Sequence, residues 1–301
     1  MGYAALSYLT LLGGILLYGG ATAVFFLGVA RSSATARASL AGEVVAKETR
    51  PAPLMLAAAA VLHFTYICAA SFVAKVCPIN SVHFILSVTA VLATVFYLAA
   101  RWIGARSSAK EGDRDAAPPA PVNRTSRENL DALGLVIAPL GLTFLLGTYF
   151  LAKPVSGPVL GSGFLALHVL VNLVVIALFV LAGASATLYL VQEKRLKTKR
   201  LGKIKNLPPL DTLDRAEHRF LIAGFPLLTI GILTGTFWSR QLEFGTTTEI
   251  MRIVFGYATW LLIAAVLLLR AAAGWRGRRS AYGTILGLIC GPGPINIFTF
   301  G

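Results

Sequence analysis

The residues best suited to chemistry are the four histidines of the chain. Imidazole is a common axial ligand of haem iron and a common proton relay inside helical bundles. His63 lies near the middle of a long apolar run, where an ionisable side chain is costly and by default indicates a functional site. The alternative is a neutral histidine that hydrogen-bonds a neighbouring helix, and the residue alone leaves both roles open.

His83 and His168 lie near the start of two other apolar runs, after the segments CPINS and GSGF. If both runs begin at the same membrane face, the two imidazoles could form a paired haem site there. Two interfacial histidines that anchor helix ends are the simpler interpretation, and spacing alone favours it. His218 stands between Glu217 and Arg219, so we expect a solvated residue or one at the lipid interface.

Other catalytic patterns are absent from the sequence. No nucleophile–base arrangement, phosphate-binding loop or zinc spacing is present, so an enzymatic role is not favoured. The three cysteines form no CxxC motif. Cys68 and Cys290 fall inside apolar runs and are expected to pack as small apolar side chains, whereas Cys77 lies between runs without an evident partner.

The elements that must position these histidines are membrane-spanning helices. The 301 residues are 56% hydrophobic and 13% charged, with a mean hydropathy of +0.73. Apolar runs of about 18 or more residues are long enough to span a bilayer, and their continuity favours helices over barrel strands. The sequence therefore predicts an all-α, polytopic bundle with about eight transmembrane helices, at residues 6–30, 53–74, 82–102, 130–152, 160–190, 219–238, 253–272 and 281–299.

The net charge is +14, and the basic residues that cause it are unevenly distributed along the chain. Of the 27 Lys and Arg residues, 23 fall in alternate connections, at 31–52, 101–129, 191–219 and 270–280. The positive-inside rule then predicts cytoplasmic loops there, both termini outside, and a bacterial-type cytoplasmic (inner) membrane. The bilayer is the expected partner of this charge. Nucleic acid is not, because no soluble face interleaves aromatic and basic residues.

We expect one membrane domain over residues 1–301 with two notable cytoplasmic connections. Residues 104–126 are small, polar and Pro-rich, which is typical of a flexible linker. The basic loop at 191–219 should begin as a helical extension and stop at Pro208 and Pro209. Asp211 or Asp214 is then expected to cap the next helix.

Four passages resemble the cytochrome c assembly membrane proteins, the CcsA and HemX-like family. They are GSGFLALHV at 161–169, LYLVQEKRLKTK at 188–199, the stretch from LPPL to GFPLLTIGILTGTFW at 207–238, and RAAAGWRGRRSA at 270–281. The last two together are specific, and CPINSVHF adds a weaker match. The resemblance covers most of the chain and implies an outer-face haem site in a helical membrane protein.

The family pattern is incomplete in this chain. The loop at 239–252 has no tryptophan and no Asp-Pro where the family carries a tryptophan-rich haem-binding motif, and leucines occupy 267–269 where it places a histidine. Of the haem-associated histidines, His168 matches well and His63 matches plausibly. The resemblance thus implies His168 and His63 as the surviving haem ligands, and haem b would need a changed ligand set for which His83 is a further candidate.

Two functions follow from these observations. The first is that the protein binds or positions haem for maturation of c-type cytochromes, which would be its partners. The alternative is a non-catalytic scaffold or regulatory subunit of a respiratory or photosynthetic membrane complex, with other membrane subunits as partners. Substitution of His168 or His63 separates them, because only the first function requires a ligand.

Overall fold

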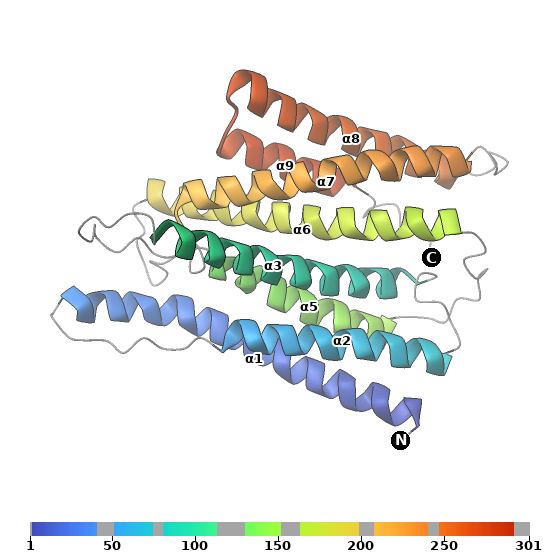
Figure 1. Cartoon of the computed structure of the whole chain (residues 1–301), viewed down its shortest axis with the longest axis horizontal. Helices are drawn as coiled ribbons and strands as arrows, with labels where there is room; N and C mark the ends of the chain where they lie inside the picture. The colour runs from blue at the N-terminus through green and yellow to red at the C-terminus, as the bar shows by residue number, and fades with distance from the viewer. Residues whose placement is uncertain are drawn as a thin grey trace.

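A computed structural model describes residues 2–40, 51–74, 81–112, 130–151, 163–198, 208–239 and 247–291. Within these ranges the chain forms eight helices and no strand, so the predicted all-α fold class is confirmed (Figure 1). The helices are α1 (Tyr3–Leu40), α2 (Ala52–Ala74), α3 (Val82–Gly112), α5 (Asp131–Leu151), α6 (Gly163–Lys197), α7 (Leu210–Ser239), α8 (Thr247–Ala273) and α9 (Arg278–Cys290).

Seven of the helices in the described part of the chain are long and apolar enough to cross a membrane. Large apolar side chains such as Leu16 and Leu54 are more than 70% exposed, which suits a surface solvated by lipid rather than water. The eighth predicted span begins as α9, whose 13 helical residues are too few to span a bilayer. The rest of that run, from residue 292 onward, lies outside the described residues.

The helices pack in two groups joined through α6. In one group α1 contacts α2 and α5, and α3 contacts α2 and α5; in the other, α6 contacts α7 and α9, and α8 contacts α7 and α9. Figure 1 shows the first group below α6 and the second beside and above it. Because α6 also contacts α3, it is the most buried candidate span. The buried polar networks discussed below lie at helix contacts within each group: one joins α1, α2, α3 and α5, and the others join α6, α7, α8 and α9.

Glycines allow α6 and α7 to approach closely, as their spacing predicts. A Cβ atom placed on Gly224 would lie 2.6 Å from Cε1 of Phe179 on α6. A Cβ on Gly231 would lie 2.9 Å from Oδ1 of Asn172, also on α6. The α7 surface that faces α6 is therefore bare backbone at these positions, and α6 side chains occupy the space.

An aromatic contact joins α7 to α8. The rings of Phe225 and Trp260 are stacked with centroids 5.6 Å apart, and the Trp260 indole N–H donates a 3.0 Å hydrogen bond to Oγ1 of Thr229. Trp260 therefore anchors α8 to α7 inside the bundle. Further along, the hydroxyls of Thr236 and Tyr257 lie 2.8 Å apart.

The connections differ from the expectations at two places and agree with them at a third. Helix α3 continues to Gly112, so the first part of the predicted linker is helical, while residues 113–129 lie outside the described ranges. Helix α6 extends to Lys197, as predicted for the start of the basic loop. Helix α7, however, begins at Leu210 directly after Pro208 and Pro209, so the end of the predicted 191–219 loop is helix.

The expected capping role of Asp214 is wrong, because this residue lies inside α7 and binds Arg270 instead. Asp211 lies in the first turn of α7, where its carboxylate interacts favourably with the positive end of the helix dipole. Its side chain pairs with Arg215 one turn later. The early start of α7 thus follows from polar partners that the sequence does not reveal.

The helix ends that carry the basic connections gather on one side of the molecule. Figure 1 shows the C-terminal ends of α1, α3, α6 and α8 and the N-terminal end of α7 toward the left. We refer to this side as the basic end and to the other as the opposite end. Cys77 and Glu243 fall outside the described residues.

Candidate functional site

His168 lies on α6 near the opposite end, with its imidazole held against α7. Its Nδ1 is 2.9 Å from Oγ1 of Thr234 on α7. The Thr234 hydroxyl donates its one proton to the carbonyl of Ile230, at 2.8 Å, or of Gly231, at 3.0 Å. Since Thr234 can then only accept from the ring, the proton of His168 sits on Nδ1 and the lone pair on Nε2.

The lone pair of His168 has one neighbour among the described residues. The Asn172 side-chain amide lies 3.2 Å from Nε2 and also donates a 2.8 Å bond to the His168 carbonyl. Asn172 is one turn further along α6, so it follows the imidazole on the same helix face. The nitrogen best suited to bind a metal is therefore occupied only by a rotatable amide.

Gly235 makes room for this imidazole. A Cβ atom on Gly235 would lie 2.9 Å from Cε1 of His168, closer than real Cβ contacts normally approach. Gly231 does the same for Asn172, so two glycines one turn apart accommodate the two α6 side chains. The glycines that pack α7 on α6 thus also form the seat of His168.

His63 has a different environment, in the core between α1, α2 and α3. The side chain is 0% exposed. Its Nδ1 lies 3.3 Å from the Tyr18 hydroxyl on α1, and its Nε2 lies 3.0 Å from Oγ of Ser87 on α3. Both ring nitrogens therefore have partners, in the manner of the hydrogen-bonded alternative considered for this residue.

The polar chain continues from His63 into α5. Oγ of Ser87 lies 2.6 Å from Oγ1 of Thr148 and donates to the Phe144 carbonyl at 3.0 Å. Thr148 in turn donates a 2.8 Å bond to the His83 carbonyl. Four helices are thus joined by one buried network, which satisfies polar groups that lipid could not.

His83, at the start of α3, is half-buried beside α5. Its ring Cδ2 lies 4.0 Å from the position of a Cβ on Gly147. His168, in contrast, contacts α7. The described contacts assign the two histidines to different helix pairs, and neither the paired haem site considered for His83 and His168 nor the favoured anchoring role is tested by them.

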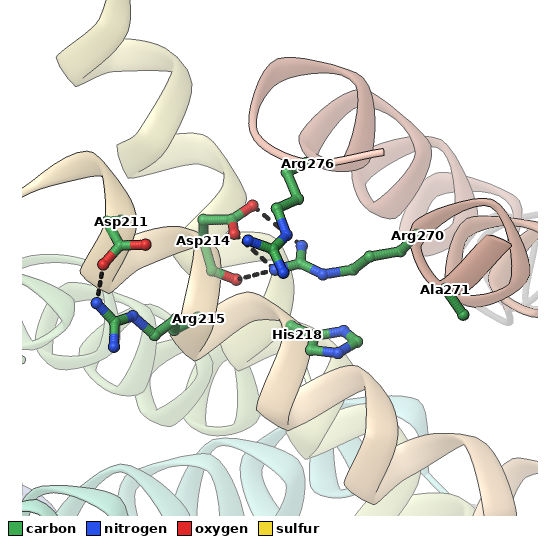
Figure 2. Close-up of a pocket in the computed structure, with 7 residues that line it drawn as sticks. All are labelled: Asp211, Asp214, Arg215, His218, Arg270, Ala271 and Arg276. Carbon is green, nitrogen blue, oxygen red and sulfur yellow. Dashed lines mark hydrogen bonds and ion pairs between the residues drawn. The ribbon is translucent and has the colours of Figure 1, made fainter. Parts of the chain in front are cut away.

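A buried ion pair lies at the basic end, between α7 and α8. Both guanidinium nitrogens of Arg270 bind the Asp214 carboxylate, at 2.6 and 3.0 Å, and the side chains are only 8% and 9% exposed (Figure 2). The backbone N–H of Gly277 donates a further 2.8 Å bond to Asp214. A bidentate pair with an additional donor is the geometry in which a buried charge pair is tolerated.

Glu217 extends this cluster toward α9. Its side chain is 0% exposed, and its Oε1 accepts bonds from Ser280 at 2.9 Å and Thr284 at 2.6 Å. Its Oε2 has no partner within the described residues. The turn before α9 is fixed by Gly277, which has a φ of 66° and whose Cβ would collide with the Tyr189 hydroxyl.

The partners of Asp214 and Glu217 in this cluster, and the partners of His168, were not identified from the sequence. Asp214 was one of two candidates for a helix cap, and Glu217 and Arg270 were given no role. The available signal was the resemblance itself: the passages at 207–238 and 270–281, which carry it most specifically, meet here through Asp214 and Arg270. Thr234 and Asn172 also lie within or beside the passages that carry it.

A cavity of about 640 Å³ opens beside the ion pair. Its charged and polar walls are Asp211, Asp214, Arg215, His218, Arg270 and Arg276 (Figure 2). His218 was expected to be solvated, yet it is half-buried and its Nδ1 has no partner in the described part of the chain. The described residues include no cluster of three His, Cys, Asp or Glu side chains placed to hold a metal ion.

The seven apolar helices found among the described residues define an integral, polytopic helical membrane protein. Within that class, the sequence matches the family described as Cytochrome C assembly protein over residues 50–300. The match covers well over half of the chain, so the chain belongs to this family, and the expected resemblance is confirmed.

Curated relatives carry the name cytochrome c biogenesis protein CcsA. The chain is 30% identical to that of Guillardia theta over 186 residues, which are 54% of this chain and 62% of the relative. It is 29% identical to that of Chlamydomonas reinhardtii over 163 residues, 52% of this chain and 45% of the relative. The chain thus matches less than two thirds of either relative's length. No solved structure matches it.

Proposed function

We propose that this protein handles haem b within the membrane during the assembly of c-type cytochromes. The observation that carries the proposal is His168, seated by Gly235 and oriented by Thr234 within a chain of the cytochrome c assembly family. The names of its relatives refer to cytochrome c biogenesis, which agrees with this role. Haem is the cargo here, and its iron is what an imidazole would bind.

The atoms of His168 suit a haem ligand. Haem iron is bound by the imidazole nitrogen that carries the lone pair, while the other ring nitrogen donates to a fixed acceptor. Thr234 provides that acceptor at 2.9 Å, and Nε2 is met only by the Asn172 amide among described atoms. Rotation of Asn172 would free Nε2, and Thr234 would keep the ring in place.

The other two histidines differ in their fitness for this task. Both nitrogens of His63 are already hydrogen-bonded in a fully buried network, so we assign it to helix packing rather than to the iron. His83 is half-buried at the start of α3 and is the candidate for a second ligand from this chain. The outer-loop tryptophan motif of the family is missing, which makes a changed ligand set necessary.

The same proposal includes the setting of the protein. We infer one membrane domain over residues 1–301, inserted in a bacterial-type inner membrane with the basic end in the cytoplasm and both termini outside. The gathering of the basic helix ends on one side supports this orientation. His168 would then lie toward the outer face, where c-type cytochromes, the proposed partners, receive haem.

The decisive experiment is an absorption spectrum of the full chain purified in mild detergent, oxidised and dithionite-reduced, with a pyridine haemochrome assay. We expect near-stoichiometric haem in the wild type and loss of the spectrum in His168→Ala, with recovery when imidazole is added. His218→Ala is the matched control. It removes a half-buried histidine from the N-terminal end of α7, whereas His168 contacts the C-terminal end of that helix. It should keep its haem.

Two outcomes would overturn the proposal. A haem-free wild-type protein from cells that make c-type cytochromes would favour the scaffold alternative. An unchanged spectrum in His168→Ala would show that the ligand lies elsewhere. Thr234→Val adds a finer arm, since loss of a hydrogen bond that orients a metal-binding histidine typically weakens binding about 10- to 100-fold.

A further inference from the structure

We propose that the cavity at the basic end binds the phosphate group of an anionic phospholipid. The cavity has a volume of about 640 Å³ and lies between the first turns of α7 and the turn from α8 to α9. Figure 2 shows Arg215 and His218 entering it from α7, and Arg270 and Arg276 entering from the other side. The haem site proposed for His168 plays no part in this inference.

The walls of the cavity carry an excess of positive charge. Both of its aspartates are committed: Asp211 pairs with Arg215, and Asp214 accepts two bonds from Arg270 and one from Gly277. Arg276 has no ion-pair partner among the described residues. Three arginines thus face two neutralised carboxylates, and the guanidinium of Arg276 is left to bind an anion.

His218 supplies an independent indication of a ligand. Its Nδ1 is buried and has no hydrogen-bond partner within the described part of the chain. Buried polar atoms in proteins nearly always have a partner, so an unpaired nitrogen in a residue that lines the cavity indicates a molecule that the protein itself does not supply. A phosphate oxygen accepts from both an imidazole N–H and a guanidinium, which matches this wall.

The surroundings favour a lipid over free phosphate. The cavity lies at the first turns of the candidate span Leu210–Phe237, which is the depth of lipid head groups. Ile222 follows His218 by one turn on α7, and Leu268 precedes Ala271, on the opposite cavity wall, by one turn on α8. Both are exposed, at 51% and 67%, so apolar surface for acyl chains begins where the charged wall ends.

The test uses native mass spectrometry of the full chain in detergent, equilibrated with equal amounts of phosphatidylglycerol and phosphatidylcholine of identical acyl chains. We expect the wild type to retain phosphatidylglycerol preferentially. Arg276→Gln should lower this preference about fivefold, the effect of one basic residue near a charged membrane surface. Arg276 makes no described ion pair, so this variant should fold normally.

Arg279→Gln is the matched control, because it removes the same charge at the start of α9, three residues after Arg276. Arg279 lies over the Trp275 ring, 5.6 Å from its centroid, and does not line the cavity. It should retain the wild-type preference. Equal losses in both variants, or no preference in the wild type, would overturn the proposal.

A competition arm distinguishes the two sources of phosphate. Millimolar glycerol 3-phosphate or inorganic phosphate should leave the bound phosphatidylglycerol in place, because neither carries acyl chains for the apolar surface. Displacement by either would overturn the lipid assignment and identify a site for soluble phosphate. All arms use protein whose haem content is irrelevant to the readout, so this proposal and the haem proposal fail separately.

Discussion

The two ends of α7 use polar residues in opposite ways. At the Leu210 end, Asp214 is saturated by Arg270 and by Gly277, and almost no surface of the pair remains exposed. At the Gly235 end, the neutral ring of His168 is fixed through one nitrogen while the other meets only a rotatable amide. A fully paired charge joins helices, whereas an imidazole with one nitrogen fixed by a hydrogen bond can still bind a ligand through the other nitrogen.

The largest effect is expected at the saturated end. Asp214→Ala leaves Arg270 buried without its counter-charge, and breaking a buried ion pair typically costs about 3–5 kcal/mol of folding free energy. We expect very low yields of folded protein and a large fall in the thermal unfolding midpoint in detergent. The measurement is the unfolding midpoint of the full chain, supported by size-exclusion chromatography.

Asp211→Ala is the control for this prediction. The Asp211–Arg215 pair also begins at an aspartate in the first turns of α7, but its partner lies one turn away on the same helix and its side chains are 63% and 65% exposed. Exposed ion pairs typically contribute about 0–1 kcal/mol, so this variant should unfold close to the wild type. Equal effects of the two substitutions would show that burial does not distinguish the pairs.

A smaller loss of stability is expected from a substitution at Gly235, where α7 packs against His168. In Gly235→Ala the new methyl group would lie 2.9 Å from Cε1 of the ring, so the imidazole or the helix must move. Overpacking of this kind costs about 1–3 kcal/mol. The displaced ring should also lose its bond to Thr234, and the haem spectrum should weaken more than stability does.

Gly256→Ala provides the comparison for Gly235. This glycine also lies in a membrane helix, and a Cβ there meets nothing within 4 Å. Its haem spectrum should be that of the wild type, and its stability should not fall. A normal haem spectrum in Gly235→Ala would contradict the seat that we assign to His168.

The sequence predicts the helices well because length and apolar character are local properties. Seven of the predicted spans were found as helices long enough to cross a membrane, and Gly231 and Gly235 have the expected close contacts. The apolar span of α7 was predicted from residue 219, with a helix cap at Asp211 or Asp214, whereas α7 begins at Leu210. Charge predicts a loop only when it is unpaired, and Asp214 finds its partner 56 residues away.

The site was harder to predict for the same reason. His63 and His168 are both histidines in apolar runs, so the sequence makes them equally good candidates for a haem ligand. What distinguishes them is their hydrogen-bond partners, which come from other helices. Tyr18 and Ser87 occupy both nitrogens of His63, while Thr234 leaves one nitrogen of His168. Such differences depend on which helices are neighbours, and a single sequence does not give that information.

The smallest expected effect tests the structural role of His63. Ser87→Ala removes the hydroxyl that His63 Nε2, Thr148 and the Phe144 carbonyl share. Hydrogen bonds between membrane helices contribute about 0.6 kcal/mol on average, so the unfolding midpoint should fall only slightly. Haem content should not change, because we place the iron at His168.

Ser185→Ala is the control that separates the effect of losing the hydrogen-bond network from the effect of removing a buried serine hydroxyl. Ser185 is also 0% exposed, but within the described residues its hydroxyl binds only the Leu181 carbonyl of its own helix. Loss of that bond should leave stability close to the wild type, since the carbonyl retains its helical partner. If Ser87→Ala removed the haem spectrum while Ser185→Ala preserved it, His63 would take part in haem binding, and the contrast between the two histidines would fail.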